Sequence, residues 1–178
     1  MTYSLAGRDP ETGDIGFAVT TSSVCVGAVT EGGVVFSQAR TDPRLHITGL
    51  RTWEQSGDVA KTLAAIKDAA TALHWRQIGV FPKSGDGLHH TGASCMDSAG
   101  GLVGTDCLKL GNFLGSDDVL PEMVRGFEVA TSDLATRLLV GILAGEAAGS
   151  ERDPLQSASV VVMGGENVKD VDFRVDSS

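Results

Sequence analysis

Two apolar-rich runs at the start of the chain, 2–7 and 15–20, flank a polar stretch that contains a proline, a glycine and two aspartates. These are residues that tight turns favour, so the stretch predicts a β-hairpin. Two more short runs of strand character, 24–29 and 33–38, follow within the first forty residues. Four short strands in succession favour antiparallel pairing.

The spacing of apolar residues becomes helical after Asp42, where Pro43 fits the first position of a helix and Asp42 fits its cap. Further helices are expected over 58–72, 119–130 and 134–148, with caps at Asp58, at Ser116 or Asp117, and at Ser132. Strand character returns over 76–81, 88–93, 100–114 with a loop at Gly111–Asn112, 158–163 and 168–175.

This order of elements defines the expected fold class. Strands, helices, strands, helices and strands, linked mostly by hairpins, predict two antiparallel sheets with helices outside them, an α+β fold. A length of 178 residues suits one domain, 1–178, whose hydrophobic core is large enough to be stable without disulfides or structural metals.

Composition narrows the classes of function. The formal net charge is −9, and there is no cluster of Lys and Arg to neutralise phosphates, so nucleic acid is not expected as a partner. No apolar stretch approaches the ~18–20 residues of a membrane span, and no signal peptide is recognisable. We therefore expect a cytoplasmic protein without a membrane partner.

The cysteines do not indicate a metal centre. Cys25, Cys95 and Cys107 are odd in number and widely spaced, which suits neither a disulfide framework nor a zinc site. No metal and no cofactor are expected.

Thr2 is the first candidate catalytic residue. Initiator methionine is generally removed when a small residue follows, and the mature chain would then begin with a hydroxyl and a free α-amine on one residue. An α-amine titrates near ~7.7–8.0, so much of it is neutral and able to accept the hydroxyl proton. The alternative is an ordinary edge-strand threonine beneath a retained Met1.

Seven segments, in order along nearly the whole chain, carry a resemblance to a known family. They are 2–19 (TYSLAGRDPETGDIGFAV), 26–29 (VGAV), 37–39 (SQA), 76–80 (RQIGV), 90–92 (HTG), 111–114 (GNFL) and 156–158 (QSA). As a set they resemble the domain of unknown function 1028 family. The resemblance implies an N-terminal-nucleophile (Ntn) hydrolase-like fold, a four-layer αββα sandwich of two antiparallel sheets between helix layers. Ntn hydrolases generally cleave amide bonds with an N-terminal Thr, Ser or Cys at the start of the first strand, where Thr2 stands.

Two segments depart from the family pattern. Ser22 and Ser23 stand where members usually carry an arginine, and 98–101 (SAGG) replaces a usual Trp-Ala-Gly-His stretch. A charge and a ring that would hold a substrate are therefore missing at these places.

Two polar segments are candidates for the walls of a cleft. His90 and Thr91 would bind or orient a substrate, with Gly92 leaving room for a close backbone approach. Because side chains alternate along a strand, His89 and His90 cannot share a face, which argues against a metal clamp. Asn112 would donate an amide N–H to a developing oxyanion, or else be a turn residue with positive φ.

The remaining candidates lie near the ends of early strands. Gln38 and Arg40 follow a strand whose end would lie near the hairpin start. Arg40 would pair with a substrate carboxylate or, alternatively, with Asp42. Ser22 and Ser23 would hold the α-amine of Thr2, or simply form a turn. Arg76 and Gln77 are expected to be structural.

These residues predict an amidohydrolase that cleaves a small-molecule C–N bond with Thr2 as nucleophile. The alternative is a non-catalytic small-molecule binding protein of the same fold with Met1 retained. A third interpretation is a cysteine-dependent enzyme that uses Cys25 or Cys95. We also expect a homo-oligomer, a dimer, in which the helix over 134–148, lined by glycine and alanine, faces another subunit.

Overall fold

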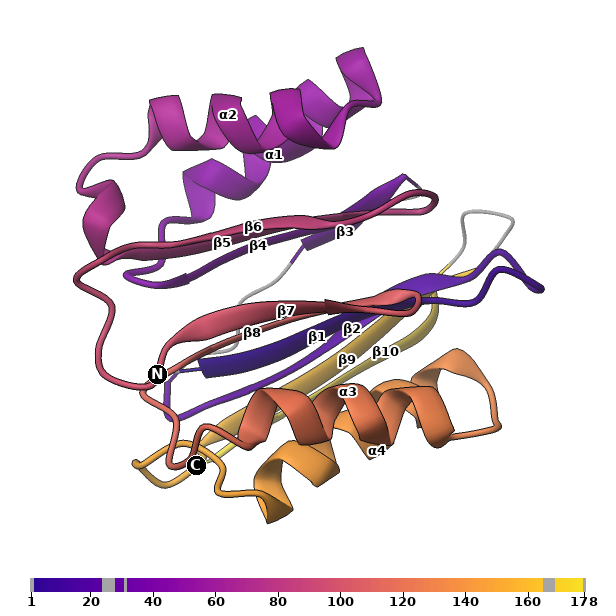
Figure 1. The fold of residues 1–178 in the computed structure, drawn as a ribbon. Helices are drawn as coiled ribbons and strands as arrows, with labels where there is room; N and C mark the ends of the chain where they lie inside the picture. Colours follow the sequence, from indigo (N-terminus) through magenta and orange to yellow (C-terminus); the bar gives the residue numbers. More distant parts are fainter. Residues whose placement is uncertain (1, 24–27, 31, 165–168, 178) are drawn as a thin grey trace.

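Within residues 2–23, 28–30, 32–164 and 169–177, which the structure describes, two antiparallel sheets face each other between two pairs of α-helices (Figure 1). The structure is a computed structural model. One sheet has six strands in the order β10-β9-β2-β1-β8-β7, and the other has four in the order β3-β4-β5-β6. Helices α3 and α4 cover the larger sheet, and α1 and α2 cover the smaller one.

The elements in chain order are β1 (Thr2–Arg8), β2 (Ile15–Thr21), β3 (Ala28–Thr30), β4 (Gly33–Ala39), α1 (Pro43–Ser56), α2 (Val59–Ala69), the 3-10 turn η1 (Leu73–Trp75), β5 (Arg76–Pro82), β6 (Leu88–Thr91), β7 (Gly100–Gly104), β8 (Cys107–Asn112), α3 (Val119–Val129), α4 (Leu134–Ala147), β9 (Ser157–Met163) and β10 (Lys169–Asp176).

The described side chains form three apolar clusters, one in each gap between layers. Tyr3 and Leu5 of β1 lie in the cluster beneath α3 and α4. Ala6 of the same strand lies with Phe36 of β4 in the cluster between the sheets. Because side chains alternate along a strand, the even-numbered residues of β1, including Thr2, face the other sheet.

Most of the predicted elements are confirmed. The hairpin at the start of the chain is present, with Thr2 paired to Thr21 and Arg8 to Ile15. Asp42 caps α1 by accepting a hydrogen bond from the backbone N–H of Arg44, and Asp58 caps α2 through Lys61. The predicted run 24–29 lies only partly within the described residues, where β3 begins at Ala28.

Some boundaries differ from expectation. The segment 100–114 is a hairpin that turns at Asp106, whose φ of 55° is a left-handed conformation that aspartate tolerates. Asn112 is thus the last residue of β8 and not part of a loop. The cap of α4 is Asp133, because its carboxylate accepts the N–H of Thr136, whereas the Ser132 hydroxyl only donates to Asp133. The residue before α3 is Asp118, whose own N–H donates to Ser116 Oγ.

The glycine-lined side of α4 packs inside the chain. A Cβ on Gly141 would lie 2.5 Å from a methyl of Leu5, and one on Gly145 would lie 2.6 Å from Met123. The glycines therefore face the interior of the chain, whereas Leu139 and Leu143 on the outer side of α4 are exposed; that the helix faces another subunit stays a prediction. The glycines let α4 approach β1 and α3 closely.

None of the helices among the described residues combines the length and apolar composition needed to cross a bilayer.

Candidate functional site

Thr2, Thr21 and Asn112 lie abreast on three neighbouring strands at the N-terminal end of β1. Thr2 is directly opposite Thr21 of β2 on one side and Asn112 of β8 on the other. The Thr2 hydroxyl donates to Thr21 Oγ1 at 2.9 Å, and Asn112 Nδ2 donates to the Thr2 carbonyl at 3.3 Å. Thr2 is 4% exposed and Asn112 2%. A hydroxyl and an amide therefore meet on the inner face of the larger sheet.

Buried polar side chains connect this inner face to the smaller sheet. Ser4 Oγ donates to Gln38 Oε1 at 2.7 Å, and Gln38 Nε2 donates to Gln77 Oε1 at 2.8 Å. Asn112 Nδ2 donates to the same Gln77 oxygen at 3.0 Å. Ser4, Gln38 and Gln77 have no exposed surface, so this network bridges the sheets within an otherwise apolar gap.

Gln77 is the hub of the network. Its Nε2 lies within hydrogen-bonding distance of three acceptors, the Thr91 hydroxyl at 3.1 Å and the carbonyls of Gly100 and Gly111 at 2.9 and 2.7 Å. Sequence reasoning assigned Gln77 a structural role and missed its place in the site. The available signal was a glutamine among the apolar residues of each of two strands, at Gln38 and Gln77.

Ser22 and Ser23 follow β2 directly beside this end of the sheet. Thr21 Oγ1 accepts the backbone N–H of Ser23 at 3.2 Å and lies 3.2 Å from the Ser23 hydroxyl. Ser23 thus joins the Thr2 cluster through Thr21, whereas Ser22 bonds to Glu151. The same contacts also organise the turn, as the alternative interpretation expected.

Glu151 lies across the same end of the sheet. It forms a β-bridge with Leu114, two residues after Asn112, and it accepts hydrogen bonds from Ser22, which follows Thr21. Glu151 is 5% exposed. Burial raises the pKa of Glu151 to about 7, although the hydrogen bonds from Ser22 lower it. Sequence reasoning did not name this carboxylate, because no local motif marks it.

The two residues predicted on β6 lie on opposite faces. Thr91 is directly opposite Gln77 and joins the network. His90 is directly opposite Ile78, which packs in the cluster beneath α1 and α2, so the structure does not bring His90 to Thr2. His89 takes the inner face instead, and burial lowers its pKa.

Arg40 lies outside the network. It is exposed, and its carbonyl accepts a hydrogen bond from Arg76 Nη1 at 2.5 Å. Asp42 forms ion pairs with Arg44 at 2.8 Å and with Arg76 at 3.7 Å. The hydrogen bond from Arg44 holds the pKa of Asp42 down at about 2. Arg76 also donates to the Thr71 carbonyl at 2.7 Å, which fits the expected structural role.

Cys95 and Cys107, the two cysteines within the described residues, do not enter the cluster. Burial raises the pKa of Cys95, which disfavours a nucleophilic thiolate. Cys107 lies on the α3 and α4 side of the larger sheet and accepts a hydrogen bond from Lys109 Nζ at 2.5 Å. Cys25 lies outside the described residues. Over the described ranges, no group of three or more His, Cys, Asp or Glu side chains is arranged to hold a metal ion.

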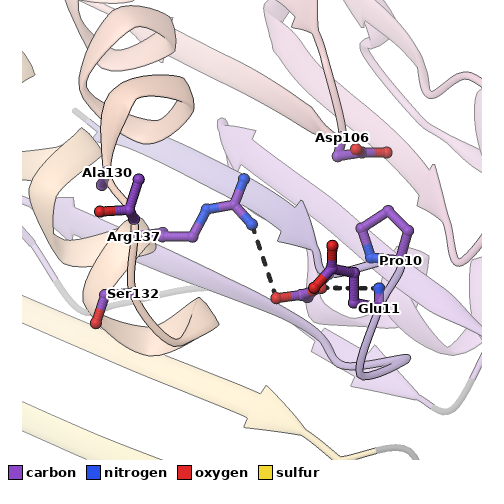
Figure 2. Close-up of a pocket in the computed structure, with 8 residues that line it drawn as sticks. Pro10, Glu11, Asp106, Ala130, Ser132 and Arg137 are labelled. Atoms are coloured by element: carbon purple, nitrogen blue, oxygen red, sulfur yellow. Dashed lines mark hydrogen bonds and ion pairs between the residues drawn. The ribbon is translucent and has the colours of Figure 1, made fainter.

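A polar cavity of about 490 Å³ opens at the opposite end of β1, beside the hairpin turn (Figure 2). Asp9, Glu11, Asp106 and Arg137 line it. Arg137 lies 3.9 Å from Asp9 and stacks over the ring of Phe127, so its charge already braces α4 against the turn. The Thr2 cluster is the better candidate, because it brings together residues from both sheets.

Comparisons with known proteins identify the family. The model of a family of unknown function, DUF1028, matches residues 2–178. The crystal structure of protein SPO2555 from Silicibacter pomeroyi, also assigned to DUF1028, superposes with a TM-score of 0.91 at 26% identity and covers 99% of this chain and 79% of that one. No curated protein is significantly similar to the sequence. The chain therefore belongs to the DUF1028 family.

Proposed function

We propose that this protein is an amide hydrolase of the Ntn type, and that its layers correspond to the αββα sandwich of that superfamily. The position of Thr2 carries the proposal. It is the first residue of β1, its side chain lies between the sheets, and it is in register with Asn112. The substrate would be a small molecule with a C–N bond that is not a peptide bond.

Removal of Met1 would make the α-amine of Thr2 the base. The amine accepts the Oγ proton as Oγ attacks the carbonyl carbon, and it then donates that proton to the leaving nitrogen as the C–N bond breaks. The acyl group remains on Thr2 as an ester. A water molecule attacks this ester, releases the acid and restores the hydroxyl.

Asn112 is the proposed oxyanion donor. Its 3.3 Å bond to the Thr2 carbonyl is long, so a substrate oxygen would replace it at low cost, while Gln77 holds the other N–H at 3.0 Å. Loss of one such donor lowers kcat by roughly 10²–10³-fold in another hydrolase. Glu151 would hold the α-ammonium form of Thr2 next to the turn of Ser22 and Ser23.

Intact-mass measurement of the purified protein tests the first step, because the proposal requires a chain that begins at Thr2. Release of an amine or ammonia from a panel of N-acyl amino acids and small carboxamides tests the second. Thr2→Ala should abolish release and Thr2→Ser should retain part of it. Thr20→Ala is the matched control. Thr20 is an equally buried threonine, but its side chain lies on the opposite face of the sheet and donates to the Ser157 carbonyl. A retained Met1, or turnover by Thr2→Ala, would refute the mechanism.

A binding protein with Met1 in place is the second candidate. The small exposure of the Thr2 and Asn112 side chains favours it, since both hydroxyl and amide already have partners within the chain. It predicts that members of the same panel raise Tm without being consumed. Loss of the compound during incubation would contradict this candidate.

A further inference from the structure

The outermost strand of the larger sheet, β10, has two unlike faces. Val171, Phe173 and Val175 are directly opposite Val162, Val160 and Ala158 of β9. Val160 and Val162 belong to the cluster beneath α3 and α4, so the apolar face of β10 points toward the helix layer. The other face carries Asp170, Asp172, Arg174 and Asp176. Phe173 and Val175 are nevertheless 70% exposed.

The size of the helix layer explains this exposure. A helix is about 10 Å wide and strands lie about 4.8 Å apart, so two helices cover about four strands. The larger sheet has six strands, and β10 lies at one edge of it, beyond α4 (Figure 1). A cavity of about 480 Å³ lies between α4 and β10, lined by Leu139, Leu143 and Val175. Leu139 and Leu143 are 45% and 59% exposed.

In one register the charge pattern of β10 is complementary to itself over most of the strand, 170–176. Two copies of the strand can pair antiparallel about a two-fold axis perpendicular to the sheet, which keeps both apolar faces on the same side. An axis at Asp172 would set that carboxylate against its own copy, and an axis at Arg174 would do the same with two guanidinium groups. An axis at Phe173 sets Asp172 against Arg174 and Val171 against Val175. Its one like-charged pairing, Asp170 with Asp176, lies at the ends of the paired segment.

We propose that β10 pairs edge to edge with β10 of a second copy of this chain, with the two-fold axis at Phe173. The pairing joins two six-stranded sheets into one continuous sheet. The two Phe173 rings meet at the axis, between the exposed leucines of the two α4 helices. The interface uses the outer side of α4, in place of the glycine-lined side.

Sedimentation velocity on the full chain over a range of concentrations tests the pairing. The unmodified chain should be a dimer. Phe173→Glu should raise the dimer Kd by about 30-fold or more, because it places two carboxylates at the centre of the interface. Ile47→Glu is the matched control, since Ile47 is a half-exposed apolar residue on α1, and it should leave the dimer intact.

A charge exchange tests the register independently of any effect of Phe173→Glu on folding. Asp172→Arg should weaken the dimer, because it sets a second guanidinium group directly opposite Arg174 of the other copy. Asp172→Arg combined with Arg174→Asp should restore it. A chain that is monomeric at every concentration would overturn the proposal. So would a dimer that Phe173→Glu leaves as tight as Ile47→Glu does, or a double exchange no better than the single one.

Discussion

Gln38 and Gln77 face each other directly on β4 and β5, and Gln38 Nε2 donates to Gln77 Oε1 at 2.8 Å. Both side chains are fully buried between the sheets. Buried amides are stable only when their donors and acceptors are paired, so this contact makes each residue of the network dependent on the others.

Gln77→Leu should destabilise the protein by about 2–4 kcal/mol, because it leaves the buried amides of Gln38 and Asn112 without their acceptor. Urea unfolding measures this change. Thr91→Val is the control, since it removes only one acceptor at a partly exposed position and should cost less than about 1 kcal/mol. Equal midpoints for the two variants would show that the network does not stabilise the fold.

Glu151 should make stability depend on pH between about 4.5 and 7. Its folded pKa is raised to about 7, so its contribution to stability is fully present below the unfolded value of 4.5. That contribution is lost as pH rises through 7, because the buried carboxyl must ionise. Glu151→Gln should therefore match the unmodified chain at pH 4 and exceed it at pH 8 by on the order of a few kcal/mol.

Thermal unfolding of both proteins across this range measures the difference. Asp153→Asn, at an exposed neighbouring position, should show a much smaller pH-dependent difference. A difference between Glu151→Gln and the unmodified chain that stays constant with pH would contradict the raised pKa.

Gly92→Ala should destabilise the protein by about 2 kcal/mol or more, because the added methyl cannot be accommodated without moving backbone. A Cβ at Gly92 would lie 2.4 Å from the carbonyl oxygen of His74 and 2.6 Å from that of Leu73. The close backbone approach expected at this glycine is thus made by the chain's own 3-10 turn. Gly100→Ala is the control, since its nearest neighbour, Leu120, is 3.8 Å away. Similar unfolding midpoints for the two alanine variants would refute this prediction.

Arg8→Lys should destabilise the protein by about 1–2 kcal/mol, because the single ammonium group of lysine cannot make the several directed hydrogen bonds of the guanidinium group. Arg8 pairs with Asp106 at 2.8 Å and donates to the carbonyls of Pro82 at 3.1 Å and Gly85 at 2.6 Å, which ties β1 to the turn after β5. Arg125 is exposed and, among the described residues, pairs only with Glu122, so Arg125→Lys should change the free energy of unfolding by less than about 0.5 kcal/mol. Chemical denaturation of both variants checks the contrast.

The sequence predicts well what local contacts determine. The turn between 2–7 and 15–20 and the caps at Asp42 and Asp58 depend on neighbouring residues, and the structure confirms them. Alternation along β6 also predicts that His89 and His90 point to opposite faces. It does not predict which of the two faces the other sheet, because that depends on how the layers pack.

The candidate site depends on contacts between residues far apart in the chain. Asn112 was predicted to be either an oxyanion donor or a turn residue with positive φ, and the left-handed residue is its neighbour Phe113, at φ 58°. Glu151 reaches this end of the sheet through its bridge to Leu114 and its hydrogen bonds with Ser22. Neither relationship follows from a local pattern.

The amide nitrogen of Gln77 has two hydrogens for three nearby oxygens, so it can exchange partners while remaining bonded. The side-chain oxygen of Gln77 cannot exchange partners in this way, because it accepts hydrogen bonds from both Gln38 and Asn112. During evolution, a substitution at any one of these three amides would leave a buried donor or acceptor without a hydrogen-bond partner. Only a matching substitution at another of the three positions would restore the pairing. We therefore expect these positions to covary among homologues, more strongly than the aliphatic residues around them.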